Sequence, residues 1–152
     1  MVSDSAVRNV IDGQAVSDVL VQYVHALDAR DWPTVAECFA SDAVFVHPGG
    51  RVDGPAAVVA RAQAALGPLD ASQHLLGSVL VTVDRDSAGA TSYFQAQHVR
   101  TGAPGGDLYV IAGTYRDRLR RDPEGWKIAE RVQEYCWRSG NPDVIVRDRR
   151  PS

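Results

Sequence analysis

The chain has 152 residues and lacks the features that mark nucleic-acid-binding and membrane proteins. It carries 16 Lys and Arg against 19 Asp and Glu, whereas a phosphate-binding surface needs an excess of positive charge. The one basic cluster, Arg147 to Arg150, includes an Asp and is expected to be a solvated, flexible tail. No apolar run approaches the ~20 residues that a membrane helix needs. We therefore expect neither a nucleic-acid partner nor a membrane partner.

Cysteine is scarce as well. Cys38 and Cys136 are the only two, too few for a structural zinc site, and each has apolar or aromatic neighbours. We expect two buried free thiols in a cytoplasmic protein. The N-terminal residues 1–6 lack the basic start and apolar core of a signal peptide, which also favours the cytoplasm. The four histidines show no metal-binding spacing, so no metal is expected.

Helical periodicity dominates the first part of the chain. Between residues 12 and 28, apolar side chains recur at the spacing of one helical face, and Asp12 is expected to cap the start. A second helix is predicted over 32–39, with Asp31 as its N-cap. An Ala-rich run predicts a third over 55–66. These three segments form a helical layer.

The rest of the chain alternates apolar and polar residues with period two, which is typical of strands. The predicted strands are 43–47, 51–53, 73–84, 90–100, 108–120 and 126–138. Short turns join the last four, which predicts an antiparallel meander. Helices followed by a meander indicate a single α+β domain with its core at about 12–141 and flexible tails. A gap between the helical layer and a curved sheet would be a small-molecule pocket.

Two polar residues are candidates for chemistry. Asp28 ends the first helix, where the helix dipole disfavours a carboxylate, so a positively charged partner is expected. His74 opens a strand, with alternation sending it opposite Leu75. Each residue also has a purely structural interpretation, as a helix end and as an exposed histidine. If they meet in one apolar cavity, a carboxylate and an imidazole can together remove a proton from carbon.

Tyr23 is a further candidate on the first helix. Its ring suits the core face, yet a hydroxyl directed into a pocket would be a general acid or an oxyanion donor. Tyr23 and Asp28 are five positions apart, which is not the spacing of one helical face. Both therefore reach one cavity only if the helix end lies across its mouth.

The remaining candidates have weaker support from the sequence. His98 shares a strand face with apolar residues, which fits either a core histidine or a pocket residue. Arg131 lies on the last predicted strand, where the alternation of apolar and polar residues does not show which face of the sheet it occupies. We place His25 on the surface and His47 in a loop or pocket rim, and interpret 116–121 as a strand end that runs into solvent.

The order of elements resembles the SnoaL-like branch of the NTF2-like superfamily from about residue 16 to residue 141. The ordered series is fairly specific, although no single member is diagnostic. It comprises Tyr23, Ala26 to Asp28, Asp31-Trp32, Phe39, Asp42-Ala43, Gly54, Gln73-His74, Phe94, His98, Gly113 to Tyr115, Gly125 to Ile128, Arg131 and Trp137 to Asn141.

The resemblance implies a cone-shaped α+β barrel, with N-terminal helices packed on a curved, mostly antiparallel sheet. Its nearest branch contains scytalone dehydratase, bile acid 7α-dehydratase and hexachlorocyclohexane dehydrochlorinase, which need no cofactor. Their Asp–His pair matches Asp28 and His74, and Tyr23 matches a tyrosine of the bile acid enzyme. His98 matches a second histidine of scytalone dehydratase, and Arg131 a pocket arginine of the dehydrochlorinase. Family members are commonly dimers or trimers, so a homodimer or homotrimer is implied, with Tyr135 and Trp137 as candidate contact surface.

The resulting functional hypothesis is a cofactor-independent lyase or isomerase of the dehydratase or cyclase type. His74 would be the base, oriented by Asp28, and Tyr23 the first oxyanion donor, with His98 and Arg131 behind it. The substrate would be a hydrophobic cyclic or polyketide-like molecule. The main alternative is a non-catalytic binding protein or accessory subunit. An epoxide hydrolase would need an Asp–Arg–Asp set, for which only Arg131 offers a centre.

Overall fold

The computed structural model describes residues 1 and 3–145, beginning with a long helix, α1 (Asp4–Ala29). The Ser3 hydroxyl caps α1 by accepting from the Ala6 amide at 3.2 Å, and Arg30 ends it in the left-handed conformation. The prediction that Asp12 caps the helix is wrong, because Asp12 lies inside it and pairs with Arg121 at 2.8 Å. The first turns of α1 have no continuous buried face, so their helical character was not visible as apolar periodicity.

Two shorter helices complete the helical layer. In α2 (Trp32–Glu37) the Asp31 carboxylate accepts from the Thr34 amide at 3.2 Å, which confirms the predicted cap. The helix stops at Glu37 because the chain enters the sheet at Phe39. The third helix, α3 (Pro55–Leu66), has the predicted bounds.

The sheet has six strands in the order β2-β1-β6-β5-β4-β3. They are β1 (Phe39–His47), β2 (Gly50–Asp53), β3 (Ala71–Asp84), β4 (Ser87–Val99), β5 (Leu108–Asp122) and β6 (Gly125–Gly140), followed by a 3-10 turn at Pro142–Val144. Strands β3 to β6 form the predicted antiparallel meander. β1 joins the sheet in parallel with β6, with Phe45 opposite Arg131. The predicted α+β class is confirmed, with a curved and mostly antiparallel sheet that stays open at β2 and β3.

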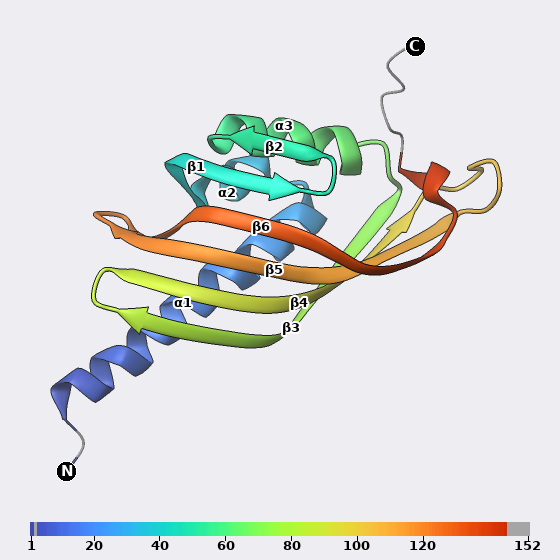
Figure 1. Ribbon diagram of the computed structural model, residues 1–152. Helices are drawn as coiled ribbons and strands as arrows, with labels where there is room; N and C mark the ends of the chain where they lie inside the picture. The colour runs from blue at the N-terminus through green and yellow to red at the C-terminus, as the bar shows by residue number, and fades with distance from the viewer. Residues whose placement is uncertain (2, 146–152) are drawn as a thin grey trace.

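Helix α1 runs obliquely across one face of the sheet, and its N-terminal turns project past the edge (Figure 1). The sheet face toward α1 carries the core, as burial along β4 alternates residue by residue. His98 lies on this inner face with Phe94 and Ala96, as predicted. The C-terminal end of α1 meets the beginning of β3, which brings Asp28 and His74 within hydrogen-bonding distance of each other.

The two cysteines differ in environment. Cys38 is buried, as predicted, and its burial raises the pKa of the thiol to about 11. The prediction for Cys136 is wrong: it is exposed near the end of β6, where the alternation of burial has given way to continuous exposure. Within residues 1 and 3–145, no helix is long and apolar enough to cross a membrane.

Candidate active site

The Asp28 carboxylate is held by three hydrogen bonds from one short stretch of β3. Oδ1 accepts from the Ser72 hydroxyl at 3.0 Å and from Nδ1 of His74 at 2.6 Å, while Oδ2 accepts from the His74 backbone amide at 2.7 Å. Burial acts to raise the pKa of Asp28, but the hydrogen bonds from His74 and Ser72 outweigh it and lower the pKa. The carboxyl group therefore stays ionised at neutral pH.

An ionised Asp28 fixes the tautomer of His74. A carboxylate only accepts hydrogen bonds, so Nδ1 carries a proton, and in the neutral tautomer that this contact selects Nε2 keeps its lone pair. The His74 side chain is 6% exposed and that of Asp28 24% exposed. This arrangement gives a nearly buried imidazole a free basic nitrogen.

Arg30 fixes the direction of the hydrogen bonds behind Asp28. Its Nη1 donates to the Ser72 hydroxyl at 2.7 Å and to the Leu27 carbonyl at 2.9 Å. A guanidinium has no acceptor, so the Ser72 oxygen accepts from Arg30 and its single proton points to Asp28. The chain of donors thus runs from Arg30 through Ser72 to the carboxylate.

His74 faces a cavity with a volume of about 60 Å³ between α1, α3 and the inner sheet face. Its walls combine aliphatic and aromatic side chains with a few polar groups. They are Tyr23, Leu27, Arg61, Ala62, Ala65, Leu66, His74, Phe94, Ala96, His98, Ile111, Tyr115, Gln133, Tyr135 and Ile145. Burial raises the pKa of Tyr23 and of Tyr115, so both phenols remain hydrogen-bond donors. A concave wall that combines apolar side chains with a few convergent polar groups is typical of a small-molecule site.

His98 places a second imidazole in this cavity, with its ring centroid 6.0 Å from that of His74. Nδ1 of His98 lies 3.1 Å from the Tyr109 carbonyl, which can only accept, so Nδ1 carries the proton. Burial is the largest influence on His98 and lowers its pKa to about 4, so the ring is neutral at pH 7. Nε2 of His98 is therefore an acceptor, like that of His74.

The buried His98 should make the protein less stable in acid. The pKa is about 4 in the folded chain against 6.5 for the ordinary group, so the unfolded chain binds more protons between these values and stability falls as the pH drops. Replacing His98 by Asn keeps a donor for the Tyr109 carbonyl and removes the titration. We expect the wild type to lose ~2 kcal/mol more than His98→Asn between pH 7 and 4.5, measured by urea unfolding. An equal loss in both proteins would contradict the assignment.

Arg131 lies behind the cavity wall and is fully buried. Its Nε and Nη2 donate to the two oxygens of Asp117 at 2.7 and 2.9 Å. Its guanidinium carbon lies 4.4 Å from the ring centroid of Tyr23 and 4.0 Å from that of Tyr115. Burial acts to lower the pKa of Arg131, but the Asp117 carboxylate raises it. The ion pair therefore supports the two tyrosines and is absent from the cavity lining.

Comparison with known proteins places the chain in a family. The profile of the SnoaL-like domain matches residues 8–132. The chain belongs to the SnoaL-like family. An uncharacterized protein of Mycobacterium tuberculosis is 28% identical over 134 residues, which is 87% of this chain and 90% of the relative.

Solved structures extend the comparison to three dimensions. A Novosphingobium aromaticivorans protein provisionally named an aromatic ring hydroxylase has a TM-score of 0.79 and 26% identity, covering 89% of this chain and 96% of its own. A protein of the same species provisionally named a scytalone dehydratase has a TM-score of 0.78 and 17% identity, covering 87% of this chain and 89% of its own. These likenesses confirm the architecture implied by the SnoaL-like resemblance.

In this SnoaL-like chain the sequence-predicted site residues separate into three positions. Tyr23, His74 and His98 line the cavity, Asp28 stands behind His74, and Arg131 stands behind the tyrosines. His25 is exposed, as predicted, and His47 lies on the rim of a neighbouring groove. No group of three or more His, Cys, Asp or Glu residues suited to a metal occurs in the part of the chain that the structure describes.

Sequence reasoning missed three supporting residues of the candidate site. Ser72 and Arg30 carry polar side chains next to the predicted pair, but their contacts depend on how α1 meets β3. The prediction that 116–121 runs into solvent is wrong for Asp117, which is 3% exposed. Its alternation with Tyr115 and Leu119 was the available signal, because all three share the inner face.

Proposed function

We propose that this protein is a cofactor-independent lyase or isomerase that removes a proton from carbon. The observation that supports it is the 2.6 Å hydrogen bond from His74 to Asp28, with His74 lining a small cavity of mixed apolar and polar side chains. Proton transfer by a positioned side chain is typically worth ~10²–10⁴ in rate. A relative in fold that is provisionally named a scytalone dehydratase is consistent with this chemistry.

In the proposed reaction, Nε2 of His74 takes a proton from a carbon next to a carbonyl group. The electron pair of the broken C–H bond moves into the carbonyl, which becomes an enolate, and the imidazole becomes an imidazolium stabilised by Asp28. In a dehydration the enolate then expels a hydroxyl group, which takes the proton from the imidazolium and leaves as water. In an isomerisation the same proton returns to a different carbon.

The other polar groups of the cavity have complementary roles in the proposal. Tyr23 donates to the oxygen on which negative charge develops, since its phenol remains protonated. His98 accepts a hydrogen bond from a substrate hydroxyl, because its Nδ1 is already occupied by the Tyr109 carbonyl. Arg131 acts through the rings of Tyr23 and Tyr115, which it holds in place without reaching the substrate.

The cavity volume restricts what can react. About 60 Å³ accommodates the reacting end of a substrate and is well below the ~300 Å³ of a typical drug-sized site. The aliphatic and aromatic side chains of the wall favour a hydrophobic ring or a polyketide-like chain, and the polar ones favour oxygen substituents on it. We expect the rest of such a molecule to extend beyond the cavity.

Hydrogen–deuterium exchange tests this function directly. The protein is incubated in D₂O with a panel of cyclic ketones and hydroxyketones, and deuterium uptake at carbon is followed by mass spectrometry. The wild type should accelerate exchange for at least one compound, and His74→Ala should not. Tight binding of the same compounds without any exchange, and without dependence on His74, would show a carrier instead.

The donor chain behind Asp28 predicts separate effects on stability and activity. Arg30 adopts the left-handed conformation with φ of 59°, which glycine tolerates better, so Arg30→Gly should keep or raise the melting temperature. Without the guanidinium the Ser72 proton is no longer directed at Asp28. We expect kcat to fall about tenfold with KM unchanged, the effect of losing one hydrogen bond to a charged group.

Two variants make this prediction specific. Arg85 also has a positive φ, of 55°, in the turn between β3 and β4, so Arg85→Gly should relax the backbone without changing kcat. Ser72→Ala should reproduce the loss of activity, and Ser72→Thr should restore it by supplying another hydroxyl. Full activity in both Arg30→Gly and Ser72→Ala would remove the donor chain from the mechanism.

A further inference from the structure

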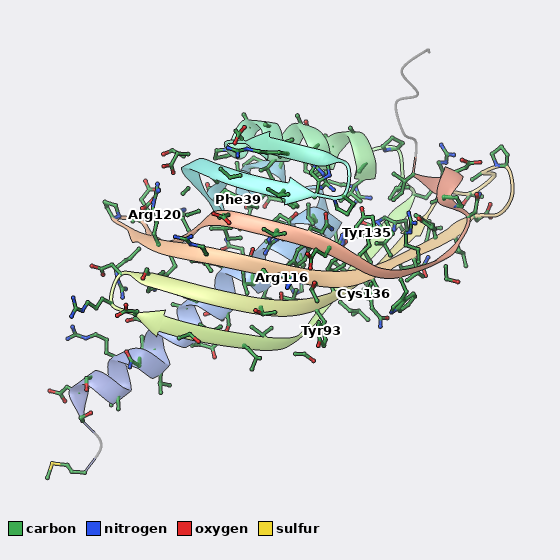
Figure 2. The ribbon with its side chains drawn as sticks, viewed as in Figure 1. Phe39, Tyr93, Arg116, Arg120, Tyr135 and Cys136 are labelled. Atoms are coloured by element: carbon green, nitrogen blue, oxygen red, sulfur yellow. The ribbon has the colours of Figure 1, made fainter. Side chains whose placement is uncertain are left out.

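A wide groove opens beside the cavity, between the β1–β2 turn, α3 and the end of β6. It has a volume of about 1090 Å³. Its walls include Tyr135, which also borders the cavity, and the half-exposed Trp137. Tyr135 and Cys136 lie next to each other on the part of β6 that forms this wall (Figure 2). The groove therefore offers aromatic surface outside the proposed reaction chamber.

The groove adjoins the cavity. Four residues line both spaces: Arg61, Ala65, Tyr135 and Ile145. A molecule whose reacting end reaches His74 and which exceeds the cavity in size must place its remainder in the groove. The groove is thus the natural location for the part of the substrate that does not react.

The charge of the groove has one sign. Arg61 and Arg138 line it, and no Asp or Glu does. His47 also lines it, but burial and the nearby Arg61 lower the pKa of His47 to about 4, so this ring is neutral at pH 7. Arg61 Nη2 donates to the neutral Gln133 side chain at 3.1 Å, and its guanidinium lies over the Phe45 ring at 5.0 Å. Neither Arg61 nor Arg138 forms an ion pair with any residue in the ranges that the structure describes. The positive charge of the groove is therefore available to a ligand.

We propose that the groove binds the far end of the substrate, and that this end is an aromatic or alicyclic body carrying a carboxylate. The body would lie against Tyr135 and Trp137, and the carboxylate would pair with Arg61 and Arg138. A planar guanidinium suits a carboxylate because it can donate two parallel hydrogen bonds. The substrate class rests on the proposed function, since it combines a reacting end at His74 with an anionic end in the groove.

The test compares 2-naphthoate with its neutral amide, 2-naphthamide, by calorimetry on the whole protein. We expect the carboxylate to bind about tenfold more tightly, corresponding to one hydrogen-bonded charge pair, and this preference to shrink at 1 M salt. Arg61→Gln and Arg138→Gln should each remove most of the preference. Arg118→Gln, which changes the net charge equally at an exposed position outside the groove, should leave it intact.

Several outcomes would overturn the groove assignment. Equal binding of the acid and the amide would do so, as would a preference that survives both arginine substitutions. If Arg61→Gln fails to fold because of its contacts with Gln133 and Phe45, Arg138→Gln at an exposed position still decides the question. A change of oligomeric state in Arg138→Gln, seen by sedimentation, would show that a second copy covers the groove instead. His74→Ala should retain the preference, so loss of catalysis and loss of the anion site are distinguishable.

Discussion

His74→Ala is expected to lower kcat by ~10²–10⁴, the range typical of a general base, while the protein stays folded. Asp28→Asn should have a comparable effect. An asparagine amide can donate to Nδ1 of His74, which would move the ring proton to Nε2, the atom that must act as base. The measurement is steady-state turnover of whichever compound undergoes exchange in D₂O, with KM determined in parallel.

Two comparisons separate this result from general damage. His25→Ala removes an exposed histidine from α1, the helix that carries Asp28, and should leave kcat unchanged. The double variant of His74 and Asp28 should be no slower than His74→Ala alone, because the two residues act as one unit. Full turnover in both single variants would show that the pair has no catalytic role.

Asp117→Asn is expected to cause the largest loss of stability, ~3–5 kcal/mol, by leaving the buried charge of Arg131 without its partner. Both side chains of the pair are 0% exposed, so water cannot compensate. In a chain of this length the loss corresponds to roughly 10 °C in melting temperature. Urea unfolding followed by circular dichroism measures it, and the activity should fall with it because Tyr23 and Tyr115 lose their support.

The same two strands supply a control for this prediction. Arg116 and Glu134 form an exposed ion pair between β5 and β6, one residue along from Asp117, and Arg116 lies in the middle of β5 (Figure 2). Glu134→Gln should change stability little, since exposed pairs are screened by water and salt. Replacing the buried pair together, as Asp117→Leu with Arg131→Met, should recover part of the loss. If Asp117→Asn unfolded at the same urea midpoint as Glu134→Gln, the buried Asp117–Arg131 pair would not have the stabilising role assigned to it.

Local patterns in the sequence predicted most elements because each repeats along one stretch of chain. Helix α3 followed from an Ala-rich run, the meander from period-two alternation, and the Asp31 cap from the chemistry of capping. The pairing of Asp28 with His74 was predicted from the family resemblance and from the poor fit of a carboxylate at a helix end. The elements depend on short-range patterns and the Asp28–His74 pair on residue identities, and both kinds of information can be read from the sequence.

The unpredicted features depend on contacts between distant segments. Alternation places Asp117 on the inner face, but no local pattern reveals that Arg131 lies beside it as the partner that makes its burial possible. The same holds for Arg30, whose guanidinium reaches Ser72 on another element. Charged residues were read as solvent-facing because an isolated charge is expensive to bury, and their partners were invisible.

The parallel pairing of β1 with β6 has a consequence during synthesis on the ribosome. The strands of the meander can pair with a neighbour as soon as it emerges, whereas Phe45 must wait for Arg131. Ordering a contact between such distant positions slows folding, and until then the edge of β1 that pairs with β6 has no partner. A nascent chain that stalls before β6 would therefore lack the neighbour of β1 and be a client for chaperones.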